Sequence, residues 1–189
     1  MKIIICKDDL KLMESKLNFG KDIKIGKIGE KMARQYLEQI GCTFVRESEG
    51  QDFKKWDIEM MFKSIPRTYE VKTDVLIRPD RMVYSEVFKK EMLLKGRETG
   101  NMFVEYQYRG VPSGIATTEA DVWVYFFHHL NEVWIIKVDE LRKLIAANDF
   151  PRFLDAGDEG SNTMGYLLPR FEHKELFKVV QYEREVINK

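Results

Sequence analysis

The sequence predicts an α/β fold with a central mixed β-sheet flanked by helices. Two short segments, residues 56–62 and 68–74, are rich in the β-branched, aromatic and methionine side chains that favour strands. In residues 26–41, apolar side chains recur at the spacing of one helical face. Residues 122–127 form a near-continuous apolar run, which suits a strand buried on both faces. Strand and helix patterns that alternate along the chain are typical of this class.

The length and composition are typical of a globular domain that can bury a hydrophobic core. The chain has 189 residues, of which 44% are hydrophobic and 33% charged. Lys plus Arg and Asp plus Glu number 31 each, so any phosphate-binding surface must be a local patch. Cys6 and Cys42, without a secretory pattern, predict free thiols in a reducing compartment. The opening apolar run is too short for a signal peptide or a membrane span, so we expect a soluble cytoplasmic protein.

Taken in order, the chain begins with an N-terminal arm and continues into the predicted core. The elements expected are a strand or apolar arm and then a polar helix (residues 8–17, ending near residues 18–20), a helix at 26–41, a strand at 42–46, a polar loop at 47–55, and a hairpin whose turn is residues 63–67. Gly41 stands where a glycine C-cap is expected. The inward stripe of the 26–41 helix is Ile28, Met32, Ala33, Tyr36, Leu37 and Ile40.

The predicted hairpin gathers charged side chains. Side chains alternate faces along a strand, so Glu70 and Lys72 share one face, and Asp57 and Glu59 share a face of the other strand. Pairing the strands brings these carboxylates together beside the lysine. Carboxylate oxygens are ligands for Mg²⁺, and a neighbouring ammonium can hold a water or stabilise charge on a phosphate. The competing interpretation is a solvated face with an exposed ion pair worth roughly 0–1 kcal/mol.

The spacing of these residues resembles a known family. Asp57, twelve further residues and then Glu70-Val71-Lys72 resemble the Asp…Glu-x-Lys signature of the PD-(D/E)XK nuclease superfamily, with Trp56 in place of its proline. The resemblance implies a restriction-endonuclease-like core and a Mg²⁺- or Mn²⁺-dependent deoxyribonuclease. It also implies that Asp57, Glu70 and the backbone carbonyl of Val71 bind metal, and that Lys72 orients or activates the attacking water.

A fourth carboxylate is expected from the helix before the sheet. Glu30 stands near the start of the 26–41 helix, where a glutamate also complements the helix dipole. In the superfamily this helix often supplies a glutamate to the metal cluster. The order Glu30, Asp57, Glu70, Lys72 is similar to that of the Holliday-junction-resolvase branch. Asp52 and Glu59 compete with Asp57 for the metal, and we favour Asp57.

A second block resembles phage-type members of the superfamily. It contains Asn101 and Glu105 on a strand, a turn at residues 110–114, and a threonine pair before Ala-Asp-x-Trp. Glu105 is expected on the strand next to Glu70 and Lys72, either joining the site or lying on the surface. Thr117 and Thr118 would bond a phosphate or cap a single helical turn within residues 115–121.

Basic residues follow the hairpin. Residues 81–95 are predicted to form a helix with a buried stripe of Tyr84, Val87, Phe88, Met92 and Leu93. A DNA backbone would be contacted by a basic set made up of Lys27, Arg78, Arg81, Lys89 and Lys90. For the charges of this segment we slightly favour the alternative, an ordinary amphipathic helix.

The C-terminal part completes the predicted domain. We expect one domain, with its core at residues 26–137, the arm at 1–25, and C-terminal helices and a strand at 138–189. The elements are an edge strand at 132–137, a helix at 138–147, a loop at 150–161, a helical stretch at 172–176 and a last strand at 178–183. His128 and His129, expected on a strand, would point to opposite faces and cannot chelate one ion. We interpret them, and His173, as structural or surface residues.

The resemblance therefore predicts a metal-dependent deoxyribonuclease. Within that class we favour a structure-selective endonuclease of Holliday-junction-resolvase type, which would act on DNA as a homodimer. The alternatives are a restriction-type endonuclease, an exonuclease, or a catalytically inactive DNA-binding or assembly protein on a nuclease fold. No phosphate loop or G-x-G-x-x-G pattern occurs, so no nucleotide cofactor is expected.

Overall fold

The computed structural model describes residues 1–15, 19–49, 55–75, 81–85, 90–94, 100–154 and 162–188. The described part has three α-helices: α1 (Lys7–Met13), α2 (Phe19–Gln39) and α3 (Val138–Ala147). Its strands are β1 (Lys2–Cys6), β2 (Thr43–Glu47), β3 (Ile58–Phe62), β4 (Ile65–Asp74), β5 (Arg81–Ser85), β6 (Lys90–Leu94), β7 (Asn101–Tyr108), β8 (Val111–Pro112), β9 (Val122–Phe127), β10 (Glu132–Lys137), β11 (Arg152–Leu154), β12 (Thr163–Pro169), β13 (Lys178–Gln181) and β14 (Glu183–Ile187). Short 3₁₀ segments are η2 (Gly114–Ala116), η3 (His128–Leu130) and η4 (Lys174–Leu176).

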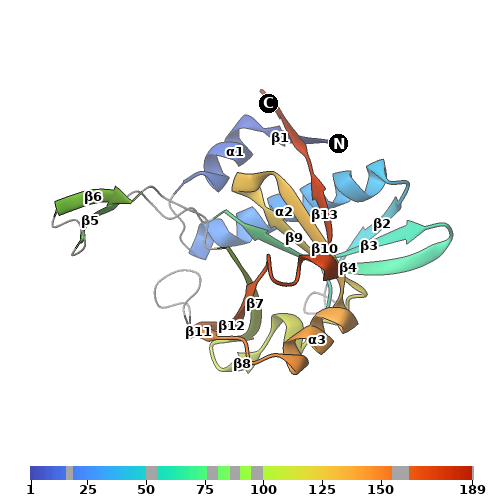
Figure 1. Cartoon of the computed structure of the whole chain (residues 1–189). Coiled ribbons are helices and arrows are strands. Elements are labelled where there is room, and N and C mark those ends of the chain that lie inside the picture. The colour runs from blue at the N-terminus through green and yellow to red at the C-terminus, as the bar shows by residue number, and fades with distance from the viewer. Residues whose placement is uncertain are drawn as a thin grey trace.

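A six-stranded mixed sheet lies at the centre of the molecule (Figure 1). Its strand order is β13-β10-β9-β4-β3-β2, in which β4 and β9 are parallel and the other neighbours are antiparallel. Every residue of β9 is buried, as its unbroken apolar sequence predicts for a strand covered on both faces. The predicted α/β class with a central mixed sheet is therefore confirmed.

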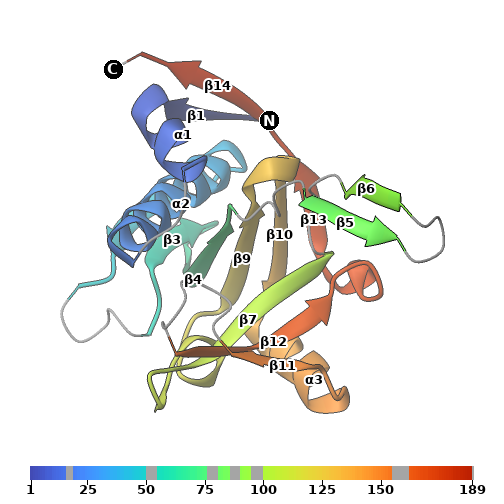
Figure 2. The same ribbon diagram turned by 90° about the vertical axis from the view of Figure 1, so that its left-hand side faces the viewer.

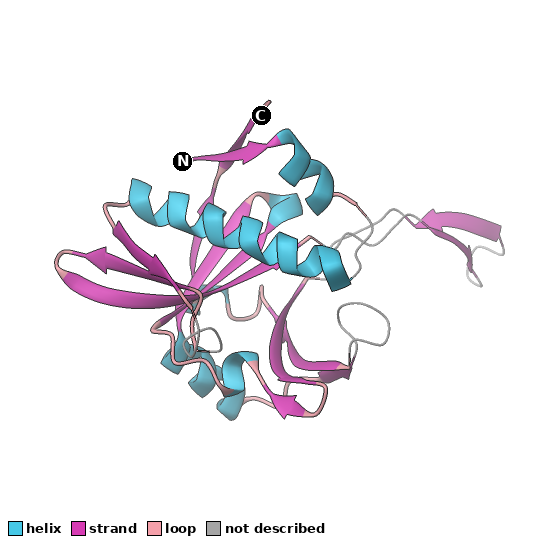
Figure 3. Cartoon of the chain, turned by 180° about the vertical axis from the view of Figure 1, so that it is seen from behind, coloured by secondary structure: helices cyan, strands magenta, loops and turns pink. Residues whose placement is uncertain are grey.

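Helix α2 covers one face of this sheet (Figure 3). Its apolar residues pack with two residues of β4 and with alternate residues of β9. The packed set includes Ile28, Met32, Ala33, Tyr36, Leu37, Tyr69, Val71, Val124 and Phe126. The helix begins at Phe19, earlier than predicted, because packing outweighs the cost of about 1 kcal/mol for each interior glycine. It ends as expected: Gly41 has a φ of 93°, and the Cys42 amide donates to the Leu37 carbonyl at 2.9 Å. Ile40, predicted to be inward, is 41% exposed.

A second sheet of four strands, in the order β11-β12-β7-β8, packs against the opposite face (Figure 2). Met102 and Val104 of β7 are fully buried against Trp123, Tyr125 and Phe127 of β9. The prediction that β7 lies beside β4 in one sheet is wrong, because β9 occupies that position. Helix α3, confirmed over its predicted range, buries Val138, Leu141 and Leu144 in the same cluster.

The hairpin of β3 and β4 is confirmed with a tighter turn. Lys63 and Ser64 both have positive φ, 50° and 65°, as in the two-residue turns that match strand twist. Strand β4 therefore begins at Ile65 and includes Pro66, which pairs with Met61 before β4 meets β9. A proline is tolerated there because that end of β4 has a partner on one side.

Two predicted helical segments differ in the structure. Within residues 81–95, β5 and β6 form an antiparallel pair of strands and not a helix. The spacing of the apolar residues fits a helix and a strand alike, and the β-branched and aromatic side chains then favour the strand. Within residues 115–121, only η2 forms, and it starts at Gly114. Thr117 follows η2 at its C-terminal end, so neither threonine caps the start of a helix.

The C-terminal part contains more strand than predicted. Strand β10 is not an edge, since β13 pairs with it at Glu132 opposite Gln181. Strand β11 lies within the predicted loop, β12 is a strand that the sequence did not predict, and the expected helical stretch is reduced to η4. The last predicted strand divides into β13 and β14, and β14 pairs in parallel with β1 (Figure 1). Such pairings join distant segments and leave no local pattern.

The adjacent histidines lie in η3 and not on a strand. His128 is buried, and its Nε2 lies 2.9 Å from Nη1 of Arg184. Burial and the charge of Arg184 lower the pKa of His128 to about 4, so it stays neutral. Its structural role agrees with the prediction. No helix among the described residues is both long and apolar enough to cross a membrane.

The contact between α2 and β4 generates a stability prediction. A Cβ on Gly29 would collide with Oγ1 of Thr73, whereas one on Gly26 would meet nothing within 4 Å. We expect Gly29→Ala to destabilise the fold by about 1–3 kcal/mol and Gly26→Ala to be neutral or stabilising by up to about 1 kcal/mol. Urea unfolding measures both changes. The double variant Gly29→Ala/Thr73→Ala should recover part of the loss, and equal effects at the two glycines would contradict this packing.

Candidate functional site

The centre of the candidate site is the part of β4 that lies between β3 and β9. Glu70 and Lys72 point to the face opposite Val71, and Glu70 is buried, at 7% exposure. The Lys72 ammonium lies 2.7 Å from Oε1 of Glu70 and 5.6 Å from the ring centre of Trp123. Trp123 stands beside Glu70 in the parallel register of β9. The lysine is therefore held between a carboxylate and an aromatic face, with a third of its side chain exposed.

Asp57 enters the site from the residue before β3. Its amide donates to the Tyr69 carbonyl at 2.9 Å, and its Oδ2 accepts from the Val71 amide at 2.7 Å. Burial, and then the negative charge of Glu70, raise the pKa of Asp57 to about 7, although Lys72 acts in the opposite direction. The carboxyl group is thus fixed against the backbone of β4 beside the Glu70–Lys72 pair.

Glu30 approaches from α2, and the charges of its carboxylate and of Lys72 and Asp57 act on one another. Its side chain is only 12% exposed and accepts from the Lys27 ammonium at 2.6 Å. Burial raises the pKa of Glu30, and the bond to Lys27 opposes that effect. The close approach of α2 to β4 at Gly29 is what brings this residue near the site.

Two further groups come from the segment between β8 and β9. Ser113 donates to Oε1 of Glu105 at 2.6 Å, and the Glu105 charge contributes to raising the pKa of Lys72. The Thr118 hydroxyl lies 3.0 Å from Oε2 of Glu70 and 2.8 Å from the Lys55 carbonyl. It has one proton, so it can donate to only one of these at a time. Gly114, with a φ of 51°, permits this segment to lie against the backbone of Glu105.

The electrostatics of the site are dominated by carboxylates. Burial lowers the pKa of Lys72, but the negative charges of Glu70, Asp57 and Glu105 outweigh it, so the pKa is raised and the lysine stays protonated. The four predicted catalytic residues therefore lie within electrostatic reach of one another. Glu105 joins them even though its strand belongs to the other sheet.

Other predicted residues lie elsewhere. Thr117 is exposed and makes no contact with the cluster, in contrast to Thr118. Glu59, the rival of Asp57, is held by Arg46 at 2.8 Å. Asp52, Arg78 and Lys89 lie outside the described residues, and Arg81 and Lys90 are described only as backbone positions of β5 and β6. From the predicted basic set, Lys27 reaches the site, where it also lies 3.6 Å from Glu47.

Sequence reasoning missed three participants. Trp123 contacts Lys72 because of the β4–β9 register, and Ser113 and the Lys55 carbonyl reach the site through loop geometry. The available signals were the turn at residues 110–114, which contains Ser113, and the Ala-Asp-x-Trp pattern, which contains Trp123, both within the block that resembles phage-type nucleases. Pairing between distant strands is not encoded in local periodicity.

The donor set fits a hard divalent cation. Asp57 and Glu70 supply carboxylate oxygens, and burial and then the charge of Glu70 raise the pKa of Asp57 because both disfavour its ionised form. Within the described ranges, no group of three or more His, Cys, Asp or Glu side chains is arranged to hold a metal ion. A site here would therefore rely on two carboxylates, a backbone carbonyl and water, a ligand set that Mg²⁺ accepts.

No protein-family model, curated protein or solved structure matches this chain. The function is therefore argued from the geometry of the site.

The raised pKa of Asp57 predicts a pH-dependent stability. In the unfolded chain an aspartate has a pKa near 3.9, so the folded protein binds this proton more tightly. The contribution of Asp57 to the free energy of unfolding of the metal-free protein should therefore fall as pH rises from about 4 to about 7, by on the order of 2 kcal/mol, while the lowered pKa of His128 acts in the opposite direction over part of this range. Comparison with a variant at Asp57 isolates this contribution.

The Asp57→Asn variant keeps an acceptor for the Val71 amide and carries no charge. We expect it to be more stable than the wild type at pH 8, with a smaller difference at pH 5, in urea unfolding with EDTA. Glu59→Gln, which removes a carboxylate paired with Arg46, is the matched control. A destabilised Asp57→Asn at pH 8 would contradict the burial of an uncompensated charge.

Proposed function

We propose that this protein is a metal-dependent deoxyribonuclease with a restriction-endonuclease-like core. The observation that supports the proposal is that Asp57, just before β3, lies close to Glu70 and Lys72 of β4, and that the Glu30 carboxylate of α2 interacts with the charges of Asp57 and Lys72. This is the set of residues that the Asp…Glu-x-Lys resemblance implies. A solvated strand face does not account for it, because Glu70 is buried.

Asp57, Glu70 and the Val71 carbonyl would hold Mg²⁺ or Mn²⁺. When bound, the ion supplies Lewis-acid stabilisation of charge on the phosphate and activation of a water. Thr118 and Lys72 fix the two oxygens of the Glu70 carboxylate, so the ligand is oriented before the ion arrives. The Val71 amide does the same for Asp57.

Lys72 acts as a cation in this proposal. Its raised pKa keeps the ammonium protonated, so it stabilises negative charge that develops on the phosphate and orients the attacking water by donating hydrogen bonds. Its side chain is one-third exposed. Glu30, bonded to Lys27, would accept from a water near the metal.

Within this class we favour a structure-selective endonuclease of the resolvase type acting as a homodimer. The support is the order of Glu30, Asp57, Glu70 and Lys72 along the chain, together with the position of Glu30 on α2. A panel of linear, nicked, single-stranded and four-way DNA distinguishes this from exonuclease or restriction-type cleavage, and sedimentation measures the oligomeric state.

Cleavage of plasmid and branched DNA with Mg²⁺, Ca²⁺ or EDTA tests the activity. We expect cleavage with Mg²⁺, lost by about 100-fold or more in Asp57→Asn, Glu70→Gln and Lys72→Ala, because each removes a ligand or a charge used in the transition state. Glu59→Gln and Lys63→Ala are matched controls from the same hairpin and should cleave normally. DNA binding without cleavage under any divalent ion would favour the alternative, an inactive binding or assembly protein.

Metal binding has its own measurement. Mg²⁺ at pH 8 should raise the melting temperature of the wild type, because ions that bind only the folded state stabilise it. The increase should be absent in Asp57→Asn and Glu70→Gln and should weaken as pH falls below about 7, where Asp57 takes up a proton. An increase of equal size in Asp57→Asn would place the ion elsewhere.

A further inference from the structure

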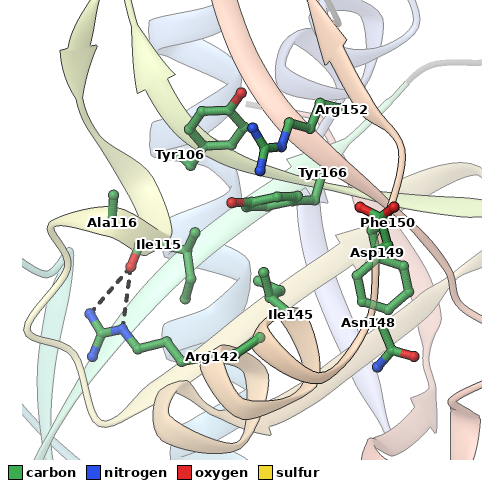
Figure 4. A pocket seen from close by; sticks show the side chains of 11 residues that line it. Tyr106, Ile115, Ala116, Arg142, Ile145, Asn148, Asp149, Phe150, Arg152 and Tyr166 are labelled. Atoms are coloured by element: carbon green, nitrogen blue, oxygen red, sulfur yellow. Dashed lines mark hydrogen bonds between the residues drawn. The ribbon is translucent and has the colours of Figure 1, made fainter.

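A pocket with a volume of about 430 Å³ opens between η2, the C-terminal end of α3 and the second sheet (Figure 4). This volume is in the range of about 300–1,000 Å³ that is typical of small-molecule sites. None of the pocket residues belongs to the candidate catalytic cluster. The pocket therefore requires an explanation of its own.

One wall of the pocket is aromatic. Tyr106 of β7 and Tyr166 of β12 pack with ring centres 4.7 Å apart at 39°, and both are half-buried (Figure 4). A tyrosine ring accepts a planar aromatic group by stacking, and base stacking tolerates any sequence because every base has a π face. The wall is suited to a nucleobase.

The pocket also contains polar groups that suit the other parts of a nucleotide. The Arg152 guanidinium lies 6.0 Å from the ring centre of Tyr166, next to the aromatic wall, and can bind a phosphate. The second arginine of the lining, Arg142, is held by the carbonyls of Ile115 and Thr118. Asn148 and Asp149 follow the C-terminal end of α3, and their oxygens can accept from an exocyclic amine of a base. A base with one attached phosphate matches these groups.

The pocket shares a structural segment with the catalytic cluster. Arg142 of α3 donates to the Ile115 carbonyl at 3.3 Å and to the Thr118 carbonyl at 2.6 Å. Ile115 lines the pocket, while the Thr118 hydroxyl contacts Glu70. The segment of residues 115–118 therefore connects the pocket with the Glu70 carboxylate.

We propose that this pocket binds one unpaired nucleotide of the DNA substrate, with its base stacked on Tyr106 and Tyr166 and its phosphate on Arg152. The inference rests on the proposed nuclease function, and it specifies the substrate: DNA with an unpaired base close to the cleaved bond. Base pairing would keep the base within the duplex and prevent its entry, so the pocket selects single-stranded or branched DNA over continuous duplex.

The test is equilibrium binding in Ca²⁺, followed by fluorescence anisotropy. The probes are a fluorescein-labelled single-stranded oligodeoxynucleotide and a duplex of the same sequence. We expect Tyr106→Leu/Tyr166→Leu and Arg152→Ala to weaken single-strand binding by about tenfold or more, and duplex binding by much less. Tyr106→Phe/Tyr166→Phe keeps the rings and should bind as the wild type does.

Controls separate the pocket from general effects. Tyr108→Leu on β7 and Lys143→Ala on α3 make similar changes outside the pocket and should leave single-strand binding unchanged. Melting temperatures show whether the leucine variant folds, and Arg152→Ala, at an exposed residue, tests the site independently.

The outcomes are distinguishable from those of the cleavage experiment. Three results would overturn the pocket assignment, even where Mg²⁺-dependent cleavage persists. They are an equal loss of affinity for single strand and duplex, unchanged affinity in variants that fold, and a wild type that does not bind the single strand. Selective loss without any cleavage by the wild type supports the pocket and removes the nuclease proposal.

Discussion

The ion pair between Glu70 and Lys72 is the constraint on which the site depends. Burying a carboxylate is costly unless a counter-charge and hydrogen bonds compensate for it, and both are present: the ammonium at 2.7 Å and the Thr118 hydroxyl at 3.0 Å. Because adjacent side chains of a strand point to opposite faces, the same stretch of β4 also buries Val71 beneath α2. One strand therefore anchors the core on one face and presents charge on the other.

The surroundings of that pair determine its chemistry. The negative charges of Glu70, Asp57 and Glu105 together raise the pKa of Lys72, and burial, followed by the charge of Glu70, raises the pKa of Asp57. A protonated lysine and an aspartate that ionises with difficulty are the expected state of a carboxylate site before a cation compensates for it. The excess of negative charge is confined to the cluster, because Glu59, on the neighbouring strand β3, forms an ion pair with Arg46.

The hairpin, the apolar stripe of α2, helix α3 and strand β9 can be predicted from the sequence, because each depends on a periodicity of side chains within a few residues. The Asp57, Glu70 and Lys72 cluster followed from alternation on two paired strands. The prediction of a helix over residues 81–95 is wrong, because the spacing of the apolar residues there fits both the helical period and the alternation of a strand. The second sheet, the β10–β13 pairing and the contact of Trp123 with Lys72 depend on register between distant strands, which composition does not reveal.

The parallel pairing of β4 with β9 has a consequence for how the molecule assembles. Thr68 and Asp121, which bond across the start of this pairing, are 53 residues apart, and β5, β6, β7 and β8 lie between them in the chain. Closing so long a loop costs entropy before any contact compensates for it, and such topologies fold slowly. Trp123 and Thr118 reach Glu70 and Lys72 only at that step, so the hairpin alone leaves its buried ion pair without these two supports.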